Sequence, residues 1–378
     1  MKPVPLFHAF RDAATDTAAL EVLHSGQIAA GPRVAAFESA LAQRLGHAEL
    51  VSTVDMSMAM LLALRLAGVG PGDEVLSPAY TCLSSTASIA NLGARPRLVD
   101  VEPLTGLLDP AALRRAISAR TKACVVYHAA GYPARTAEIA SICREAGLPL
   151  IEDCNTALGA RQDGQSVGQQ GDFAVYSFYP NRQINAADGG ALGLRDAAQA
   201  QRARRLRRFG VALSGFRDAL GEIDSASDVA EIGWSGAMSQ LHAALGLAQM
   251  ESLDARLTAT RRNAADLASR LQSLSDQGLK LVQATAGSEP SPWGLLVLVE
   301  QRDAVLAALK RAGVMASKLH HRVDSYSGFG ADPAELPGTA AFLARVIALP
   351  CGHWLQPADL GRVTGAVDVS IRLARSAA

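Results

Sequence analysis

Several side chains that could form a nucleophilic site lie at or just after the ends of short apolar runs. They are Cys82, His128 and Asp153, and Asn155 follows closely. A histidine can take the proton of a thiol while a carboxylate or amide orients the imidazole, as in acyl transfer. The alternative interpretation is that Cys82 fills space as a small buried hydrophobe and that Asp153 caps the next helix. We take Cys82, His128 and Asp153 as candidate catalytic residues and Asn155 as a candidate substrate contact.

Two further residues could bind an anion. Tyr179 and Arg182 lie just after the apolar run 173–177. A guanidinium forks onto a carboxylate or a phosphate, so Arg182 is a candidate cofactor contact and Tyr179 a candidate substrate contact. A salt bridge from Arg182 to Asp55 or to Asp188 is an equally good interpretation.

A pair of histidines near the C-terminal end supplies one more candidate. His320, beside His321, could reach the site from a second domain and contact the substrate. A metal site would need further ligands at a fitting spacing, which the sequence does not offer. The five cysteines form no Cys-x-x-Cys pair, so neither a disulfide framework nor a zinc ribbon is expected.

The elements that must position these residues alternate along the chain. Short apolar runs predict strands, and apolar residues at helical spacing predict helices between most of them. The predicted strands are 74–77, 97–100, 123–127, 149–153, 173–177 and 190–194. This alternation predicts an α/β fold with a mostly parallel sheet covered by helices on both faces. Ligands of such sheets bind beyond the carboxyl ends of the strands, where the candidates lie.

The pattern changes near residue 252, which divides the chain into two predicted domains. Residues 1–251 form a large α/β domain, and residues 252–378 form a smaller C-terminal α+β domain that begins with an Arg-rich helix at 253–274. A chain of 378 residues is long enough for two cores. Residues 210–228 are rich in Gly, Ser and Asp, which predicts a loop.

Composition limits the possible partners. The formal net charge is zero, so neither nucleic acid nor an acidic membrane surface is indicated. No stretch approaches the roughly 18 apolar residues that span a membrane, and the first residues lack the apolar centre of a signal peptide. We expect a cytoplasmic protein whose partner is a small-molecule substrate.

Motifs along nearly the whole chain point to one family. Residues 171–190 read GDFAVYSFYPNRQINAADGG, residues 68–78 read GVGPGDEVLSP, and residues 91–101 read NLGARPRLVDV. These segments resemble, in order and spacing, motifs of the DegT/StrS sugar aminotransferases, which depend on pyridoxal phosphate (PLP). The resemblance implies a type I PLP-transferase fold and a homodimer with active sites at its two-fold interface.

The resemblance also implies roles for individual residues. The family lysine that forms the Schiff base with PLP corresponds to Arg182, whose guanidinium stays protonated and cannot act as the amine. Asp153 corresponds to the aspartate that pairs with the pyridine nitrogen. Ser177 and Ser57 correspond to positions that contact the phosphate. We therefore expect no covalent cofactor, while non-covalent binding of PLP or of pyridoxamine phosphate (PMP) stays open.

Other cofactor positions depart from the family. Asp55 stands in the phosphate loop, where its charge opposes a phosphate. Cys82 replaces the aromatic residue that stacks on the cofactor ring, and Thr156 replaces a glutamine or histidine beside it. These departures, together with Arg182, predict weak cofactor binding.

The leading hypothesis is a diverged family member that modifies a small polar metabolite or a sugar nucleotide in bacterial biosynthesis, without lysine-dependent transamination. The first alternative is an aminotransferase or dehydratase of a nucleotide-linked sugar that binds PLP or PMP non-covalently. The second is a non-catalytic partner of an active paralogue. The fold alone does not identify the substrate.

Overall fold

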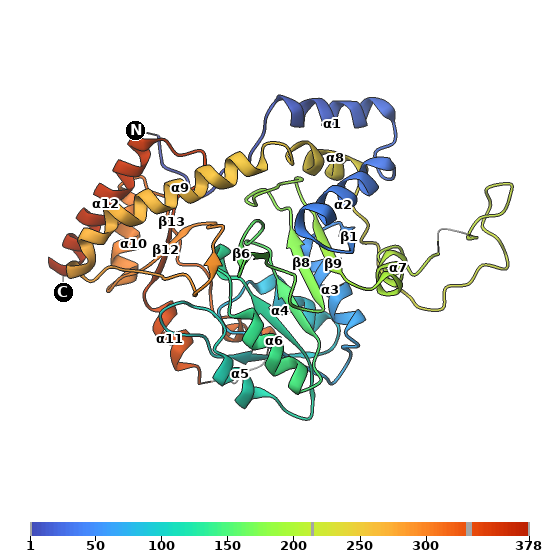
Figure 1. The fold of residues 1–378 in the computed structure, drawn as a ribbon, viewed down its shortest axis with the longest axis horizontal. Helices are drawn as coiled ribbons and strands as arrows, with labels where there is room; N and C mark the ends of the chain where they lie inside the picture. The colour runs from blue at the N-terminus through green and yellow to red at the C-terminus, as the bar shows by residue number, and fades with distance from the viewer. Residues whose placement is uncertain (1, 213–214, 330–334, 377–378) are drawn as a thin grey trace.

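The large domain is built on a seven-stranded sheet, shown in the computed structural model of Figure 1. The structure describes residues 2–212, 215–329 and 335–376. In the order β1-β9-β8-β5-β4-β2-β3, β9 is antiparallel to both neighbours and the other six strands run the same way. The strands are β1 (Glu49–Thr53), β2 (Glu74–Pro78), β3 (Arg95–Val99), β4 (Thr121–Tyr127), β5 (Leu150–Asp153), β8 (Phe173–Ser177) and β9 (Gly190–Leu194). This arrangement confirms the predicted fold class.

Helices cover both faces of this sheet. They are α2 (Pro32–Leu45), α3 (Met56–Leu66), α4 (Leu83–Asn91), α5 (Pro110–Ala116), α6 (Thr136–Glu145), α7 (Ala197–Leu206) and α8 (Gln240–Ala248), and α1 (Ala13–Ser25) packs outside them on α8. In β4, Ala123 and Val125 pack into a core with α3 and α7, whereas Cys124 and Val126 pack into a core with α5 and α6. Because successive residues of a strand point to opposite faces, both must be apolar when both faces are covered. Continuous apolar runs therefore mark these strands in the sequence.

The rest of the chain forms a smaller lobe, at the left of Figure 1. Its antiparallel sheet contains β10 (Lys280–Leu281), β12 (Leu295–Leu298) and β13 (Val346–Leu349). Its helices are α9 (Leu253–Leu271), α10 (Arg302–Arg311), α11 (Pro337–Leu343) and α12 (Pro357–Ser376). A third, small sheet joins β11 (Ser288–Glu289), β6 (Arg161–Gln162) and β7 (Gln165–Ser166). Over the described ranges, no helix is long and apolar enough to cross a membrane.

A half-buried carboxylate ties the two lobes together where β3 ends. Asp100 accepts the backbone N–H groups of Gly338 at 2.9 Å and of Thr339 at 2.7 Å, and also the Thr339 hydroxyl at 2.7 Å. A Cβ atom at Gly338 would clash with the carbonyl oxygen of Val101. Asp100 therefore satisfies the first turn of α11 from the other lobe, and glycine at 338 permits the close approach.

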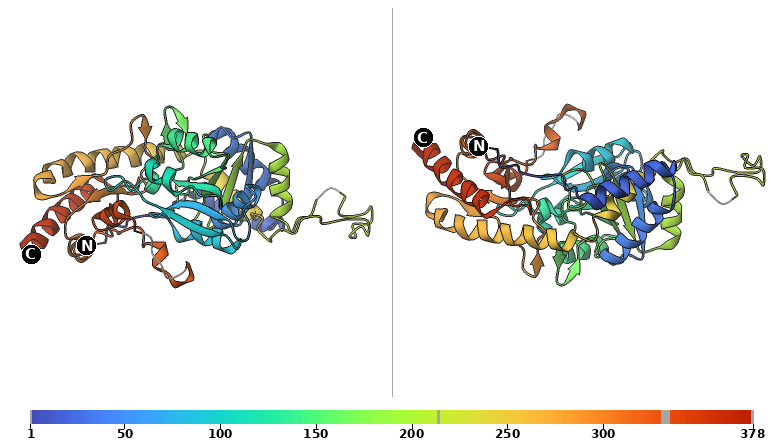
Figure 2. Two further views of the ribbon diagram at one scale, coloured as in Figure 1. Left: turned by 90° about the horizontal axis from the view of Figure 1, so that it is seen from below. Right: turned by 90° about the horizontal axis from the view of Figure 1, so that it is seen from above.

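One segment leaves the body of the molecule. Residues 215–232 extend outward beyond α7, as both views in Figure 2 show, and we call them the arm. Leu220, Ile223 and Ile232 of the arm are 87%, 60% and 75% exposed. The arm therefore exposes apolar side chains to solvent in the single chain.

Candidate functional site

The carboxyl ends of the six co-directional strands meet at one edge of the sheet, and most candidate residues lie there. Asp153 is the last residue of β5, His128 follows β4, and Cys82 follows β2 as the N-cap of α4. His320 reaches this edge from the small lobe, with its Nε2 atom 3.4 Å from the hydroxyl of Tyr127. Parallel strands thus bring together residues that are far apart in the sequence.

Asp153 is fully buried and both of its oxygens are engaged. The Ser85 hydroxyl donates to Oδ2 at 2.6 Å, and Asn155 donates its backbone N–H at 3.1 Å and its Nδ2 at 2.9 Å to Oδ1. Burial raises the pKa of Asp153, and these hydrogen bonds offset the rise only in part. Asp153 is therefore a buried carboxyl group whose two oxygens both accept hydrogen bonds from neighbouring residues.

Arg182 lies among the same side chains. Its Nη1 donates to Oδ1 of Asn181 at 2.8 Å, while its Nε is buried without a hydrogen-bond partner among the described residues. Burial lowers the pKa of Arg182, and the nearby Tyr127, Cys82 and Asp153 counteract this only in part. Since an arginine stays protonated near neutral pH, the site holds a partly buried positive charge.

The salt bridges considered for Arg182 are not formed. Oδ1 of Asp55 accepts the N–H of Met58 at 2.7 Å, and Oδ1 of Asp188 accepts the N–H of Gly189 at 2.8 Å. Each carboxylate thus satisfies local backbone, and within the described residues Arg182 has no acidic side chain in ion-pair contact. That expectation was wrong.

Aromatic rings from both lobes lie close together at this edge of the sheet. The ring centroid of His320 lies 5.2 Å from that of Tyr80 and 5.9 Å from that of Tyr127. Burial and the charge of Arg182 lower the pKa of His320 to about 4, so its imidazole is neutral at pH 7. Burial raises the pKa of Tyr80 and of Tyr127, so both remain phenols. We call Asp153, Arg182, Tyr80, Tyr127 and His320 the strand-end site.

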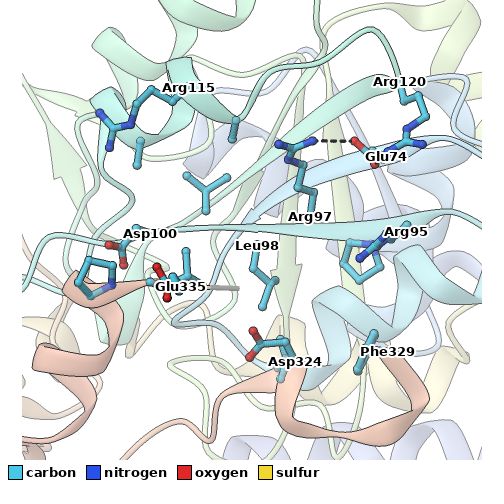
Figure 3. Close-up of a pocket in the computed structure, with 17 residues that line it drawn as sticks. Glu74, Arg95, Arg97, Leu98, Asp100, Arg115, Arg120, Asp324, Phe329 and Glu335 are labelled. Carbon is cyan, nitrogen blue, oxygen red and sulfur yellow. Dashed lines mark hydrogen bonds and ion pairs between the residues drawn. The ribbon is translucent and has the colours of Figure 1, made fainter. Parts of the chain in front are cut away.

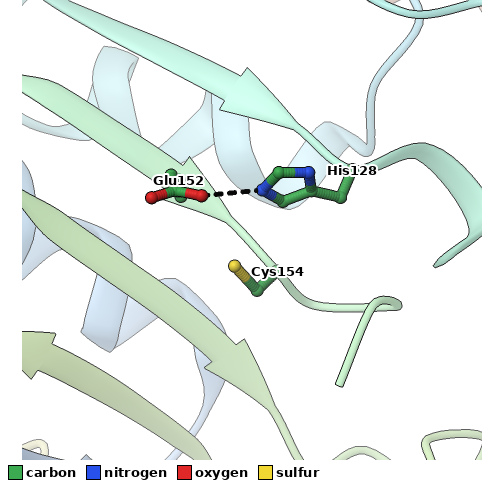
Figure 4. Close-up of side chains that lie close together, drawn as sticks. All are labelled: His128, Glu152 and Cys154. Carbon is green, nitrogen blue, oxygen red and sulfur yellow. Dashed lines mark hydrogen bonds and ion pairs between the residues drawn. The ribbon is translucent and has the colours of Figure 1, made fainter. Parts of the chain in front are cut away.

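His128 does not pair with Cys82, which corrects the expected relay. Its Nε2 lies 3.0 Å from Oε2 of Glu152, as Figure 4 shows, and its Nδ1 accepts the N–H of Ala134 at 3.1 Å. Because Nδ1 accepts, Nε2 carries the proton and donates to Glu152, so neither ring nitrogen is free for a thiol. Cys82 instead lies 3.2 Å from the Ser84 hydroxyl. The imidazole of His128 is hydrogen-bonded to the buried carboxylate of Glu152, which the sequence analysis did not consider.

Glu152 is a fully bonded buried carboxylate. Its Oε1 accepts the N–H groups of Gln170 at 2.8 Å and of Gly171 at 2.6 Å, and its Oε2 accepts that of Gly168 at 2.8 Å. Burial alone would raise the pKa of Glu152, but the hydrogen bond and electrostatic interaction with His128 and the amides of Gly171 and Gly168 lower it overall. Glu152 therefore holds the 168–171 turn against β4 and β5.

Cys154 completes a trio with His128 and Glu152. Their ligand atoms lie within 4.8 Å of one another, the one such grouping in the described part of the chain. Nε2 of His128 and Oε2 of Glu152 already form hydrogen bonds within the protein. All three residues are fully buried. The grouping is therefore explained by internal hydrogen bonding.

The first turn of α3 is where the family resemblance implies a phosphate contact. Asp55 is the N-cap of this helix, so its carboxylate holds the position that an anion would take at a helix N-terminus. Ser57 lies in the same turn, and its carbonyl accepts the Ser88 hydroxyl at 3.3 Å. Ser177 ends β8, where its Oγ accepts the N–H of Tyr179 at 3.4 Å, and Tyr179 itself is 52% exposed.

A small cavity lined by Arg182 and a larger cavity along β3 differ in their relation to these residues. Arg182, Arg256 and Trp293 help to line one of about 40 Å³, which holds a water molecule or two but no pyridine ring. The other, of about 480 Å³, follows the open edge of β3 (Figure 3). There Glu74 pairs with Arg97 at 3.3 Å and with Arg120 at 2.6 Å. Its described lining includes none of the candidate residues, so it is separate from the strand-end site.

Sequence reasoning missed three residues that shape the site. Tyr80 was signalled, because it follows β2 at the same sheet edge as the candidates. Ser85 and Glu152 carry no such signal. Ser85 and Asp153 are hydrogen-bonded although 68 residues separate them in the sequence. Glu152 lies next to His128 only because β4 and β5 are paired in the sheet.

Comparisons with known proteins bear on the family and the fold of the chain. The chain matches the DegT/DnrJ/EryC1/StrS aminotransferase family over residues 11–368. TlmJ, an aminotransferase from Streptoalloteichus hindustanus, is 31% identical with a TM-score of 0.91, over 99% of this chain and 100% of TlmJ. CalS13, a sugar aminotransferase from Micromonospora echinospora, is 30% identical with a TM-score of 0.91, over 97% of this chain and 99% of CalS13.

A more distant structure shows the same fold. Spr1654 from Streptococcus pneumoniae, solved in a PMP form and a PLP form, has a TM-score of 0.89 at 22% identity, over 98% of this chain. The match covers 100% of the chain in the PMP form and 99% in the PLP form. From the family match over nearly the whole length and the shared fold, we conclude that the chain belongs to the DegT/DnrJ/EryC1/StrS aminotransferase family.

Proposed function

We propose that this protein acts on a small polar metabolite or a nucleotide-linked sugar without lysine-dependent transamination. The observation that carries the proposal is Arg182, which stands at the family's lysine position in the sequence and lies beside Asp153 and Tyr127 in the fold. A guanidinium cannot form the Schiff base through which PLP is held covalently. CalS13, a sugar aminotransferase, supports a sugar-like substrate.

The described residues do not fit covalently bound PLP. Besides Arg182, the N-terminus of α3 is capped by the carboxylate of Asp55, which repels a phosphate. Both carboxylate oxygens of Asp153 accept hydrogen bonds from Ser85 and Asn155. In bound PLP, one of these oxygens would have to accept the pyridine N–H instead. We therefore assign no chemical step to this cofactor.

Non-covalent binding of PLP or PMP is the second candidate. It is favoured by Asp153, which keeps a buried carboxyl group at the end of β5, and by Ser177 at the end of β8. A ligand would have to displace the Ser85 hydroxyl from Asp153. We expect such binding to be weak, because losing hydrogen bonds to charged groups costs about 1.5–3 kcal/mol each.

We also propose a cytoplasmic homodimer. The exposed Leu220, Ile223 and Ile232 of the arm support a second copy as the covering surface. Helix α8 and the region of α2 are the other expected interface elements, with the arm near the neighbouring site.

An absorbance scan with PLP, followed by borohydride reduction and peptide mass spectrometry, tests the proposal. We expect no reducible adduct on any of the five lysines (Lys2, Lys122, Lys280, Lys310 and Lys318). An adduct that maps to one lysine, with transamination of an amino donor, would overturn it.

A further inference from the structure

The cavity of about 480 Å³ along the edge strand β3 lies between the two lobes. Its large-lobe wall comes mainly from β3 and α5, as Figure 3 shows. Its small-lobe wall consists of Val323, Asp324, Phe329, Glu335, Leu336 and Pro337. The volume falls in the range of about 300–1,000 Å³ that is usual for ligand cavities, so an organic molecule fits here.

Four arginines line the large-lobe wall, and two of them have no partner. Arg97 and Arg120 share a single carboxylate, that of the buried Glu74. The guanidinium groups of Arg95 and Arg115 are exposed and form no hydrogen bond or ion pair with the residues that the structure describes. This wall therefore presents guanidinium donors that the chain itself leaves unsatisfied.

The carboxylates of the lining are mostly committed to other groups. Asp324 pairs with Arg322 at 2.7 Å, and Asp100 accepts three donors at the start of α11. Within the described ranges, Glu335 is the lining acid without a hydrogen bond or ion pair. Figure 3 shows Asp324 and Glu335 on the small-lobe side, away from the guanidinium groups. One acidic group is thus attracted to the arginine wall, whereas a second negative charge would be repelled by these acids.

Apolar side chains from both lobes complete the lining. The large lobe contributes Leu98 of β3 and two alanines of α5, Ala112 and Ala116. The small lobe contributes Val323, Phe329 and Leu336. Ligand cavities typically combine apolar walls with a few polar groups that fix orientation, and this cavity has both.

We propose that the cavity binds a monocarboxylic acid with an apolar body. The carboxylate accepts hydrogen bonds from the arginines of β3 and α5, and the apolar body packs against Leu98 and Phe329. The ligand then touches both lobes beside the Asp100 contact, so its binding stabilises their folded arrangement. The site is independent of the proposed function, because its described lining contains no residue of the strand-end site.

Calorimetric titration with phenylacetate at neutral pH tests the assignment against four related probes. Acetate lacks the apolar body, and 2-phenylethanol lacks the charge. Phenyl phosphate carries a second negative charge, and phenylalanine adds an ammonium group that Glu335 would attract. Thermal melts with and without phenylacetate measure whether binding stabilises the fold.

Two double variants remove the same charge from different places. Arg95→Met combined with Arg115→Met removes the unpaired guanidinium groups and is called the cavity variant. Arg144→Met combined with Arg205→Met, at exposed positions on α6 and α7 outside the lining, is the matched control. Phe329→Ala removes the ring from the small-lobe wall. The Tm of each variant without ligand verifies that it folds.

We expect wild type and the matched control to bind phenylacetate more tightly than the other four probes, with a rise in Tm. The cavity variant should bind it about tenfold more weakly and Phe329→Ala about threefold more weakly. Equal binding of acetate or 2-phenylethanol, or tighter binding of phenyl phosphate or phenylalanine, would overturn the assignment. So would no binding at about 10 mM phenylacetate, an unchanged affinity in the cavity variant or Phe329→Ala, or an equal loss in both double variants.

The two proposals fail separately. A lysine adduct with PLP would overturn the proposed function and leave carboxylate binding beside β3 intact. Absence of phenylacetate binding would overturn the present assignment and leave the proposed function unchanged.

Discussion

At the scale of single residues, Arg182 costs the protein stability. A partly buried guanidinium with an unpaired Nε has lost water without gaining a full set of partners. We expect Arg182→Met to raise the free energy of unfolding by about 1 kcal/mol, since an unsatisfied buried polar group costs about 1–3 kcal/mol. Urea denaturation of Arg182→Met beside Arg205→Met measures the difference. A loss of stability in Arg182→Met would mean that the guanidinium is satisfied in solution.

Glu152 has the opposite effect on stability. In wild type the Glu152 carboxylate accepts backbone N–H groups, and Glu152→Gln would place an amide N–H₂ donor against those donors. We therefore expect the substitution to lower the free energy of unfolding by about 3 kcal/mol. Glu145→Gln, at an exposed pair with Arg114, should leave stability nearly unchanged. Chemical denaturation at pH 7 compares the two variants, and similar values for both would contradict this prediction.

The pH dependence of Glu152 has a definite sign. Its folded pKa lies below the ordinary value of 4.5, so its contribution is present above pH 4.5 and is lost as the pH falls through the folded pKa. The stability of Glu152→Gln should therefore depend less on pH below 4.5 than that of wild type. Parallel curves for the two proteins in that range would refute this assignment of charge.

The lowered pKa of His320 predicts a second pH range in which stability changes. Its pKa falls from 6.5 to about 4 on folding, so the unfolded chain binds the extra proton between these values and stability declines as pH falls from 6.5 to 4. His320→Asn should reduce that slope by less than about 1.4 kcal/mol per pH unit, because His320 is partly exposed. Thermal melts across this range provide the measurement. The curves of both proteins should run parallel above pH 7, and an unchanged slope below pH 6.5 would contradict the prediction.

At the scale of elements, the strands were predictable because burial on both faces leaves a continuous apolar run. β8 and β9 have their predicted bounds, and the predicted runs for β2, β4 and β5 differ from the strands by one or two residues. β1 was not predicted, because its pairing with β9 joins segments far apart in the chain. The same limit applies to the site. Strand ends indicated Asp153, Cys82 and His128, but the capture of His128 by Glu152 depends on tertiary contact.

Two substitutions of Asp55, the N-cap of helix α3, distinguish its capping role from the effect of its charge. Asp55→Ser keeps an N-cap oxygen, so we expect little change in stability, whereas Asp55→Ala should cost about 1 kcal/mol. Both remove the negative charge at the helix N-terminus and should strengthen non-covalent PLP binding. Asp109→Ser, at the N-cap of α5, is the matched control and should not affect PLP. Absorbance titration measures the affinity, and equal PLP binding by all four proteins would show that Asp55 does not exclude the phosphate.

At the scale of the whole molecule, the arm predicts how copies associate. Leu220→Ser combined with Ile223→Ser removes apolar surface that extends away from the body, so we expect the dimer to dissociate at least tenfold more readily, at roughly 1 kcal/mol or more per buried side chain. Leu373→Ser, at an exposed position on α12, is the control. Light scattering over a dilution series gives the dissociation constant. A wild type that stays monomeric at micromolar concentration would rule out this arrangement.

The Asp100 contact has a mechanical consequence. One carboxylate at the end of β3 holds three donors at the start of α11, and no side chain larger than glycine fits at 338. Rotation of the small lobe at this junction would break three hydrogen bonds to one half-buried carboxylate, so we expect the junction to resist opening. His320 and Tyr127 are joined by one hydrogen bond of 3.4 Å, so we expect the lobes to separate more readily there than at Asp100.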